Sequence, residues 1–549
     1  MDGQMMHMPL LTSSLLLHAQ RHHGDQEIVS RRVEGDIHRY TYRDLAARSR
    51  KLVGALNKLG VQPGQCVGSL AWNGYRHMEL YYGVSGSGRV LNTINPRLHA
   101  DQVVFIADHA EDQVLFFDLT FLPLVEAIVS RVSSIRHCVA LIDRANMPAQ
   151  TSIPNLLCYE ELLDAESDDP DYQWPALDEQ CAATLCYTSG TTGNPKGVLY
   201  SHRSTLLHTF AAALPDSLNC SAADVILPVV PMFHVNAWGL PYAACMTGAK
   251  LVFPGAGLDG KSLYDLFEAE GVTMAAGVPT VWQGLLAHVQ ANGLQFSTMR
   301  RTVIGGSACP PAMVRAFEED YQVHVIHAWG MTELSPLGTV CAFKGKHQAQ
   351  TPDERRAIQA KQGRAVFGVD MKIVSPEGRE LPCDGEHAGD LLVRGHWVVS
   401  RYFKQDEAES PLEQGWFPTG DVAKIDADGY MQITDRSKDV IKSGGEWIGS
   451  IDLENIAMAH PAVAMAACIA AVHPKWDERP LLVVMKKPGA EVDRDELLAF
   501  YEGKIAKWWT PDDVVFVESM PLGATGKMLK HRLRDQFRNH LIEAGGPKR

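Results

Sequence analysis

Patterns that mark special classes of protein are missing from this sequence. Its 11 cysteines are scattered along 549 residues without a Cys-x-x-Cys pair, which argues against a disulfide framework and a thiolate zinc site and favours the reducing cytoplasm. No run reaches the roughly 18 apolar residues that a membrane-spanning helix needs. The leucine-rich N-terminus is interrupted by Thr12, Ser13 and Ser14, so we expect no secretory signal.

Basic residues are also in the minority. Lys and Arg number 51 against 65 Asp and Glu, which gives a formal net charge of −14. A chain of this charge repels nucleic acid, so we expect no nucleic-acid partner, and any bound anion must be held by local groups. The content of 46% hydrophobic and 21% charged residues is typical of a globular enzyme.

The alternation of helix-like and strand-like segments predicts an α/β fold. Apolar residues recur at helical spacing between 41 and 59, which predicts a helix there. Short apolar or β-branched runs predict buried strands. These strands cover 113–117, 249–253, 302–304 and 323–326. The motifs described below follow such strands, where open α/β sheets bind ligands.

The sequence changes character after Asp435. Apolar runs at 462–472 and 481–485 are followed by a helix that Asp493 opens, a strand at 514–517 and a basic final helix. This pattern predicts a compact α+β module of about 110 residues. We therefore expect a large N-terminal domain of layered sheets and helices over 1–435, and a small C-terminal domain over 436–549.

The most informative segment, Tyr187 to Val198, reads Tyr-Thr-Ser-Gly-Thr-Thr-Gly-Asn-Pro-Lys-Gly-Val. Its hydroxyls and glycine-freed backbone amides can surround phosphate oxygens, while Lys196 adds a positive charge. It is not a Walker A loop, because Gly197 rather than Ser or Thr follows the lysine. A flexible surface linker is the alternative interpretation.

This segment resembles the phosphate-loop signature of the acyl-adenylate-forming enzymes, a superfamily that includes acyl-CoA synthetases and peptide adenylation domains. Four further motifs agree in the family's order, so the resemblance covers about residues 30–535. The loop residues that it assigns to the nucleotide are Thr188, Ser189, Gly190, Thr191, Thr192, Gly193 and Lys196, with Thr192 also assigned to the metal.

The second motif, Ala328 to Glu333, reads Ala-Trp-Gly-Met-Thr-Glu. A Thr hydroxyl and a Glu carboxylate at a strand end suit an Mg²⁺ ion that bridges ATP phosphates. Trp329 stands where many family members have Tyr, and Gly305-Gly306-Ser307 resembles the segment that packs on adenine, with a plain turn as the alternative. The resemblance assigns Gly306, Ser307, Ala328, Trp329, Gly330 and Met331 to the nucleotide, Thr332 and Glu333 to catalysis, and Glu333 to the metal.

The remaining nucleotide motifs lie near the expected domain boundary. Asp421 ends the stretch Gly-Trp-Phe-Pro-Thr-Gly-Asp, and a carboxylate after such a turn can accept both ribose hydroxyls. The resemblance assigns Asp421 and Arg436 to the ribose, although lone charged residues are ordinarily solvated at the surface. It also implies a hinge at Lys438 and a loop that lines the CoA tunnel, with Lys442, Gly444, Gly445 and Trp447.

The fifth motif ends in Lys527, which the resemblance identifies as the lysine of the adenylation step. When a carboxylate attacks the α-phosphate of ATP, negative charge builds on the phosphate oxygens and on the departing pyrophosphate. A positioned ammonium stabilises that charge.

The acid side of the site is predicted from the apolar stretch 231–239, which holds a His, an Asn and a Trp. It resembles fatty acyl-CoA ligases, in which the residue matching Trp238 gates the acyl tunnel and that matching His234 lies beside the substrate carboxylate. The alternative is a buried strand with a satisfied His. The predicted acyl-pocket residues are His234, Val235, Trp238 and Gly305, and His234 is also assigned to catalysis.

The resemblance implies a two-step ligase. A carboxylic acid and MgATP give acyl-AMP and pyrophosphate, and the thiol of CoA then gives acyl-CoA and AMP. The acid is a medium- to long-chain fatty acid or a short acid such as 3-methylthiopropionate, and a homodimer is expected because some relatives dimerise. Two alternatives remain: an adenylating enzyme with a carrier protein as acceptor, and a nucleotide sensor without activity. The charged catalytic groups are all present, which disfavours the second.

Overall fold

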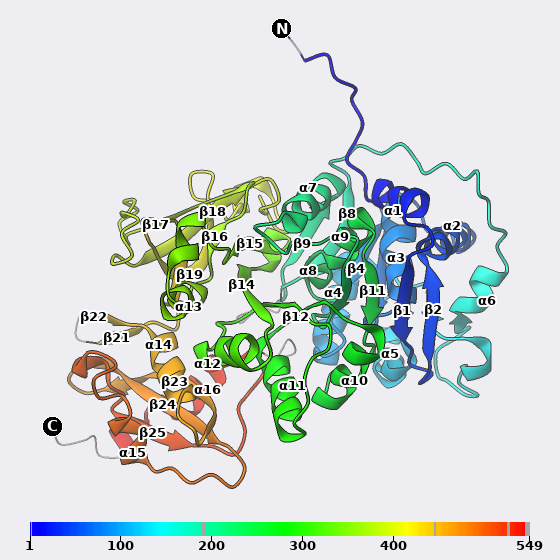
Figure 1. Cartoon of the computed structure of the whole chain (residues 1–549). Helices are drawn as coiled ribbons and strands as arrows, with labels where there is room; N and C mark the ends of the chain where they lie inside the picture. The colour runs from blue at the N-terminus through cyan, green and yellow to red at the C-terminus, as the bar shows by residue number, and fades with distance from the viewer. Residues whose placement is uncertain (2, 189–193, 444–445, 524–526, 544–549) are drawn as a thin grey trace.

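The computed structural model describes residues 1, 3–188, 194–443, 446–523 and 527–543. In this part of the chain the strands form four sheets, three before residue 437 and one after it (Figure 1). The predicted α/β fold, with a large N-terminal and a small C-terminal domain, is confirmed.

Two sheets with parallel centres form most of the N-terminal domain. One has the order β7 (Leu157–Cys158), β6 (His137–Ala140), β5 (Val114–Phe117), β3 (Cys66–Leu70), β4 (Val90–Thr93), β8 (Ala182–Tyr187) and β9 (Gly197–Ser201). The other has the order β16 (Arg364–Ala365), β15 (Leu337–Val340), β14 (His324–Gly330), β13 (Arg301–Ile304), β12 (Met274–Gly277), β10 (Val225–Pro228), β11 (Lys250–Phe253), β1 (Glu27–Arg31) and β2 (Ile37–Thr41). Because β12, β13 and β14 are parallel neighbours, their carboxyl ends meet at one edge.

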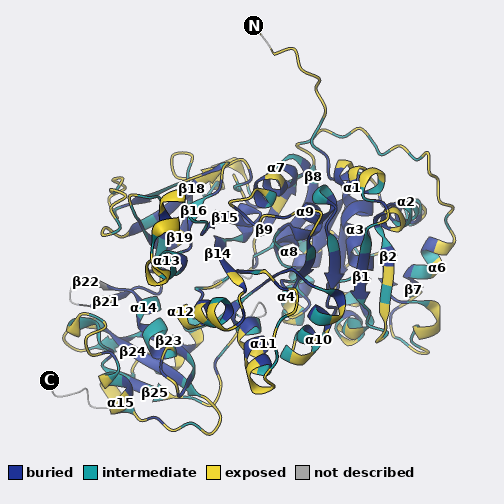
Figure 2. Ribbon diagram, in the orientation of Figure 1, coloured by how far each residue is buried: buried dark blue, intermediate teal, exposed yellow. Residues whose placement is uncertain are grey.

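Helices cover these two sheets, and the interior between them is buried (Figure 2). Helices α1 (Thr12–His22), α2 (Tyr42–Lys58), α3 (Tyr75–Gly86), α7 (His202–Ala213) and α9 (Leu240–Thr247) contact one another. The other helices of this domain are α4 (Ala100–Ala110), α5 (Leu122–Ile128), α6 (Tyr159–Asp164), α8 (Val235–Trp238), α10 (Gly260–Glu270), α11 (Pro279–Ala291), α12 (Pro311–Arg315) and α13 (Pro352–Gln359).

Local sequence signals predicted several of these elements closely. The expected helix over 41–59 is α2, and Thr41 caps it by accepting a hydrogen bond from the Asp44 amide. Strands β5, β11 and β13 lie within one residue of their predicted ends. Strand β14 was predicted to end near residue 326 but continues to Gly330, because its last three residues pair with β15 in the antiparallel direction.

A third, antiparallel sheet completes the N-terminal domain. Its order is β17 (Val369–Val374), β18 (Gly389–Gly395), β19 (Phe417–Ile425) and β20 (Met431–Arg436). In the register of β19 and β20, Asp421 lies opposite Arg436. Two residues that are 15 positions apart are therefore direct neighbours across the sheet.

The C-terminal domain is one five-stranded sheet with helices on both faces. Strands β22 (Glu446–Ile448), β21 (Ile441–Ser443), β24 (Asp477–Lys486) and β23 (Val463–His473) follow in this order, and β25 (Asp513–Phe516) pairs with β24. Helices α14 (Ser450–Met458) and α15 (Arg494–Ala499) pack on one face, and α16 (Lys530–Phe537) and α17 (His540–Glu543) on the other. Strand β24 begins four residues before the predicted apolar run, because three charged residues and Pro480 continue its hairpin with β23.

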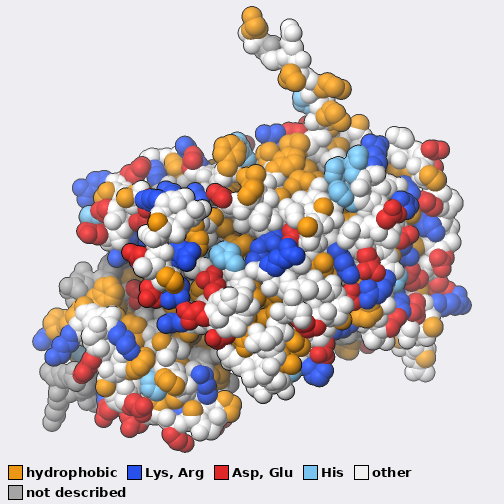
Figure 3. All heavy atoms as spheres, in the orientation of Figure 1, with side chains coloured by type: hydrophobic (Ala, Val, Ile, Leu, Met, Phe, Trp, Pro, Cys, Tyr) orange, Lys and Arg blue, Asp and Glu red, His pale blue; other side chains and the backbone are white. Residues whose placement is uncertain are grey.

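No helix in the described ranges is long and apolar enough to cross a bilayer. The first residues of the chain extend away from the body (Figure 1). Figure 3 shows hydrophobic side chains on this extension and over α7, and the exposed residues there include Met5 and Phe210.

Candidate active site

A cleft of about 1130 Å³ lies where the carboxyl ends of β13 and β14 meet the antiparallel sheet and the C-terminal domain. Most of the predicted site residues line it. They are Thr188, His234, Val235, Trp238, Gly305, Gly306, Ser307, Ala328, Trp329, Gly330, Met331, Thr332, Glu333, Asp421, Arg436, Lys438 and Lys527. Residues from five separate motifs are therefore gathered around one cavity.

The remaining predicted residues do not line the cleft or are not described. Lys196 is exposed, and its ammonium lies 4.7 Å from the ring centre of Tyr402, which does line the cleft. Lys442 is exposed in β21 and does not line the cleft. Predictions at Ser189, Gly190, Thr191, Thr192, Gly193, Gly444 and Gly445 fall outside the described residues, and Trp447 is described only in its backbone.

Glycine is required where β13 ends at the cleft. A Cβ at position 305 would lie 2.9 Å from the Ala328 carbonyl oxygen and 3.3 Å from Cη2 of Trp238. Gly306 has a φ of +82°, which side-chain-bearing residues rarely adopt, and a Cβ there would lie 3.7 Å from Cε of Lys527. Both glycines therefore let Trp238 and Lys527 approach the backbone at the end of this strand.

A buried carboxylate faces the cleft from β19. Asp421 is 1% exposed, and its Oδ2 accepts a hydrogen bond of 3.0 Å from the Trp329 indole. The Nε atom of Arg436 lies 2.7 Å from its Oδ1. Burial raises the pKa of Asp421, while Arg436 and Trp329 oppose that rise. The Trp329 indole thus helps to hold this carboxylate.

Lys527 enters the same cleft from the C-terminal domain. The pKa of its ammonium is lowered to about 8, mainly by burial and then by the charge of Arg436, while Asp421 and Glu333 act in the opposite direction. Burial, followed by the charge of Lys527, lowers the pKa of His234 to about 3. His234 is therefore a neutral imidazole at pH 7, able to donate or accept a hydrogen bond without adding a charge.

Glu333 is positioned by a residue that sequence reasoning missed. The Tyr402 hydroxyl donates a 2.8 Å hydrogen bond to Oε1 of Glu333, and burial raises the pKa of this carboxyl. A second hydroxyl, that of Tyr200, donates to the Thr332 carbonyl at 2.6 Å. Neither tyrosine belongs to a motif, so only the fold could identify them.

This donor set fits a magnesium ion that arrives with its nucleotide. Mg²⁺ is commonly held by one or two carboxylates together with substrate phosphates. Glu333 supplies a buried carboxylate at the cleft, and among the described residues no group of three or more His, Cys, Asp or Glu could hold a metal alone. Glu333 is therefore the described residue that would hold the ion, which would neutralise phosphate charge there.

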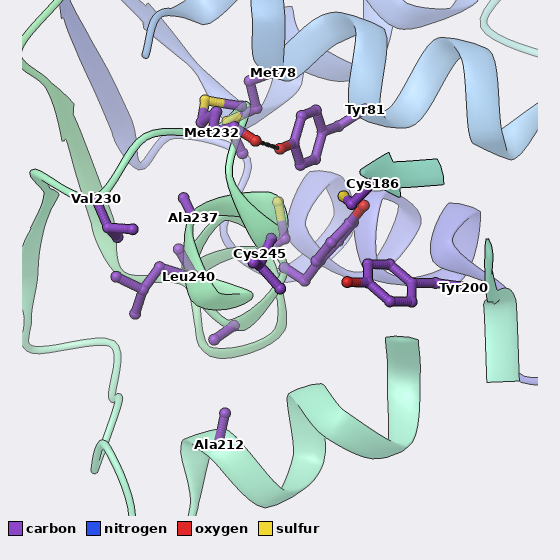
Figure 4. Packing of buried hydrophobic residues seen from close by; sticks show 14 of the residues in the cluster. Met78, Tyr81, Cys186, Tyr200, Ala212, Val230, Met232, Ala237, Leu240 and Cys245 are labelled. Carbon is purple, nitrogen blue, oxygen red and sulfur yellow. Dashed lines mark hydrogen bonds between the residues drawn. The ribbon is translucent and has the colours of Figure 1, made fainter. Parts of the chain in front are cut away.

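The acid side of the cleft has an unusual backbone. Val235, Asn236, Ala237 and Trp238 have φ values of 47°, 52°, 49° and 56°, and Gly239 follows at 78°. Left-handed backbone costs about 1–2 kcal/mol for each residue with a side chain, so the surrounding packing must hold this turn. Figure 4 shows the buried side chains around it, with the Tyr81 hydroxyl bonded to the Met232 carbonyl at 2.5 Å. The alternative of a buried strand is excluded here.

One further contact joins the two domains beside the cleft. The Asp435 carboxylate, at the end of β20, accepts a 2.6 Å hydrogen bond from the Ser450 amide, the first amide of α14. Both residues are buried, and Lys530 donates to the Ser450 hydroxyl at 2.5 Å. The N-cap residue Gly449 has no side chain that could accept a hydrogen bond from an amide of α14. A helix of the C-terminal domain is therefore capped by a residue of the preceding sheet.

Comparison with known proteins agrees with this geometry. A family described as "AMP-binding enzyme" matches residues 16–403, and "AMP-binding enzyme C-terminal domain" matches residues 452–527. The chain is 55% identical to a 3-methylmercaptopropionyl-CoA ligase of Ruegeria lacuscaerulensis, over 98% of this chain and 100% of that one. It is 51% identical to a medium-chain-fatty-acid–CoA ligase of Ectopseudomonas oleovorans, over 99% of both chains.

Solved structures show the same fold. The crystal structure of the anthranilate CoA ligase AuaEII in complex with anthranoyl-AMP superposes with a TM-score of 0.86 at 24% identity, covering 98% of this chain and 99% of that one. The two family matches and the full-length relatives confirm the resemblance inferred from the motifs. The chain therefore belongs to the AMP-binding enzyme family.

Proposed function

We propose that this protein is an ATP-dependent acyl-CoA ligase that activates a carboxylic acid through an acyl-AMP intermediate. One observation carries the proposal: Lys527, Asp421 and Glu333 share a single cleft with the Trp238 side chain and the two glycines that follow β13. The nucleotide-binding side and the acid-binding side of the cleft thus meet at Lys527, a cation from the small domain. The relatives named as CoA ligases support the same conclusion.

The proposed chemistry follows from the charges around the cleft. An oxygen of the carboxylate attacks the α-phosphorus of ATP, the bond to the β-phosphate oxygen breaks, and pyrophosphate leaves. Lys527 stabilises the negative charge on the phosphate oxygens. Asp421 accepts hydrogen bonds from the ribose hydroxyls, and the neutral His234 lies beside the carboxylate of the acid. In the second step the CoA sulfur attacks the acyl carbonyl and loses its proton, and AMP leaves with its bonding electrons.

The acid is proposed to be a medium- to long-chain fatty acid or a short acid such as 3-methylthiopropionate. Apolar side chains of Leu218, Val303 and Leu337 also line the cleft, which supports an aliphatic substrate. Relatives named for 3-methylmercaptopropionate and for medium-chain fatty acids are similarly close to this chain. They support both acids, and a carrier protein is the alternative acceptor.

The second step is proposed to need another arrangement of the small domain. Lys442 and the β21–β22 strands lie outside the cleft while Lys527 lies inside it. We propose that the chain rotates near Lys438, with the domain boundary at 435/436, so that the loop containing Lys442, Gly444, Gly445 and Trp447 lines the CoA path. A few residues can absorb such a rotation.

We also propose a cytoplasmic location and a homodimer. The unpaired cysteines support a reducing compartment. The exposed methionines of the N-terminal extension, Met5, Met6 and Met8, support association with a second copy. Analytical ultracentrifugation of the whole chain and of a chain lacking residues 1–9 tests the dimer.

The experiment that tests the main proposal is AMP release from ATP with CoA and Mg²⁺ across a panel of acids. The panel runs from propionate to palmitate and includes 3-methylthiopropionate and cinnamate. We expect AMP and acyl-CoA in equal amounts with at least one acid, and no AMP when the acid is omitted. Pyrophosphate release without any acyl-CoA would instead favour the carrier-protein alternative, and no turnover with any acid would refute the ligase.

A further inference from the structure

A buried amide connects the acid side of the cleft with the strand that leads to its nucleotide side. Asn236 is 4% exposed, and its Nδ2 donates a 2.9 Å hydrogen bond to Oγ1 of Thr184. Cys186 lies 3.5 Å away as a weak sulfur donor to Oδ1 of the same amide. Thr184 and Cys186 lie on one face of β8, two residues apart. Both the nitrogen and the oxygen of the Asn236 side-chain amide thus contact β8.

The turn that holds Asn236 cannot depend on backbone preference alone. Asparagine and glycine tolerate left-handed backbone, whereas Val235, Ala237 and Trp238 do not. Within the turn, the Ala237 amide donates to the His234 carbonyl at 3.2 Å and the Gly239 amide to the Asn236 carbonyl at 3.0 Å. These bonds shape the turn but do not attach it to the sheet. The Asn236 side chain attaches the turn to β8, and the backbone amides of Val235 and Asn236 add a weaker contact with the Cys186 sulfur.

Both ends of this turn face the cleft, although Asn236 itself does not. His234 and Trp238 line the cavity, and the Trp238 ring lies against the Cα atoms of Gly305 and Gly306, where added Cβ atoms would be 3.3 Å and 3.9 Å from it. The other end of the connection, β8, leads directly to Thr188, which lines the cleft on the nucleotide side. A shift of the amide would therefore move the Trp238 ring relative to the nucleotide-binding strand.

We propose that Asn236 is a positioning residue that sets acid selectivity, because its bond to Thr184 fixes the left-handed turn that holds Trp238 over Gly305. The proposal rests on the acyl-CoA ligase function proposed above. It assigns no contact with substrate to Asn236. It predicts that loosening the turn widens the cleft beside Trp238, so longer acids gain relative to shorter ones.

The test compares Asn236→Ala with Thr184→Val, which removes the same bond from the strand side and leaves the sequence of the turn intact. The measured quantity is the ratio of kcat/KM for octanoate to kcat/KM for butyrate. This ratio does not depend on the fraction of folded enzyme, so a purely structural defect leaves it unchanged. We expect the ratio to rise about fivefold in each variant, the change that corresponds to about 1 kcal/mol.

A matched control is Asn92→Ala. Asn92 is a fully buried asparagine of β4, the strand next to β8, and its amide donates to Asp112 at 2.8 Å. It does not line the cleft, so its loss should lower stability without changing the ratio. The double variant of Asn236 and Thr184 should shift the ratio no further than the larger single change, because both remove one bond.

An activity-independent measurement separates this proposal from the proposed function. In protein labelled with 5-fluorotryptophan, the fluorine resonance of Trp238 is assigned by its loss in Trp238→Phe. We expect this resonance to shift or broaden in Asn236→Ala and Thr184→Val but not in Asn92→Ala. An unchanged resonance and an unchanged ratio would overturn the role of Asn236. If the unaltered enzyme turns over no acid, the ligase function fails, and the resonance alone decides about Asn236.

Discussion

The charge of Lys527 predicts how adenylation depends on pH. Burial in the cleft lowers the pKa of this ammonium to about 8. The protonated form is the active one, because it stabilises negative charge on the phosphates. Activity is therefore present below the pKa and lost as the pH rises through it. About 91% of the enzyme is protonated at pH 7 and about 9% at pH 9, so kcat/KM should fall about tenfold between them.

The assay is pyrophosphate release in the absence of CoA, at subsaturating ATP and acid, between pH 6.5 and 9.5. These conditions report the pKa of the free enzyme. A second series at saturating ATP and acid measures kcat. Bound ATP adds negative charge next to Lys527 and raises its pKa, so the descending limb of kcat should lie at higher pH than that of kcat/KM.

Two substitutions test whether Lys527 is the titrating group and whether it acts only in adenylation. Lys527→Arg keeps its charge throughout this range, so we expect a flat profile at a reduced rate. Lys527→Ala should abolish acyl-AMP formation while the conversion of preformed acyl-AMP by CoA largely survives. If Lys527→Arg retains the descending limb near pH 8, another group titrates there. Equal loss of both half-reactions in Lys527→Ala would contradict a role confined to adenylation.

Other substitutions test the two sides of the cleft and the core. Trp238→Ala should change the acid profile and leave the KM for ATP within about twofold, and an unchanged profile measured by AMP release would remove Trp238 from the acid site. Asp421→Asn should raise the KM for ATP about tenfold or more, because hydrogen bonds to a charged group contribute about 1.5–3 kcal/mol. Initial rates at varied ATP concentration measure this KM, and an unchanged KM would contradict the assignment of Asp421 to the ribose. Phe267→Ala, which empties a buried position of α10, should lower the free energy of unfolding by about 3–5 kcal/mol in urea titrations, and a loss below about 1 kcal/mol would show that the site collapses on itself.

Local sequence signals predicted those parts of the fold that local physics determines. The capped helix α2 and the strands β5, β11 and β13 depend on apolar spacing and on turn residues within a few positions. The extension of β14 depends instead on a partner strand that begins at Leu337. Its pairing places Trp329 beside Asp421, a contact across 92 positions that no spacing rule contains.

The candidate site was predictable mainly through its motifs. The resemblance assigned Asp421, Arg436 and Lys527 to one nucleotide-binding site, and all three line the same cleft. Tyr402, which holds Glu333, carries no motif and was missed. The left-handed turn was missed for a different reason, since Asn236 and Gly239 favour it but the residues between them do not.

The carboxylate of Asp435 also decides where this chain can be cut for domain exchange. It lies on the N-terminal side of the proposed boundary at 435/436, yet the amide that it caps begins a helix on the other side. In a chimaera joined at this boundary, Ser450 comes from one parent and residue 435 from the other. The helix then keeps its cap only if the parent of the large domain also has a capping residue at position 435. A junction placed before Asp435 transfers helix and cap as one unit, so recombination between relatives should succeed more often there.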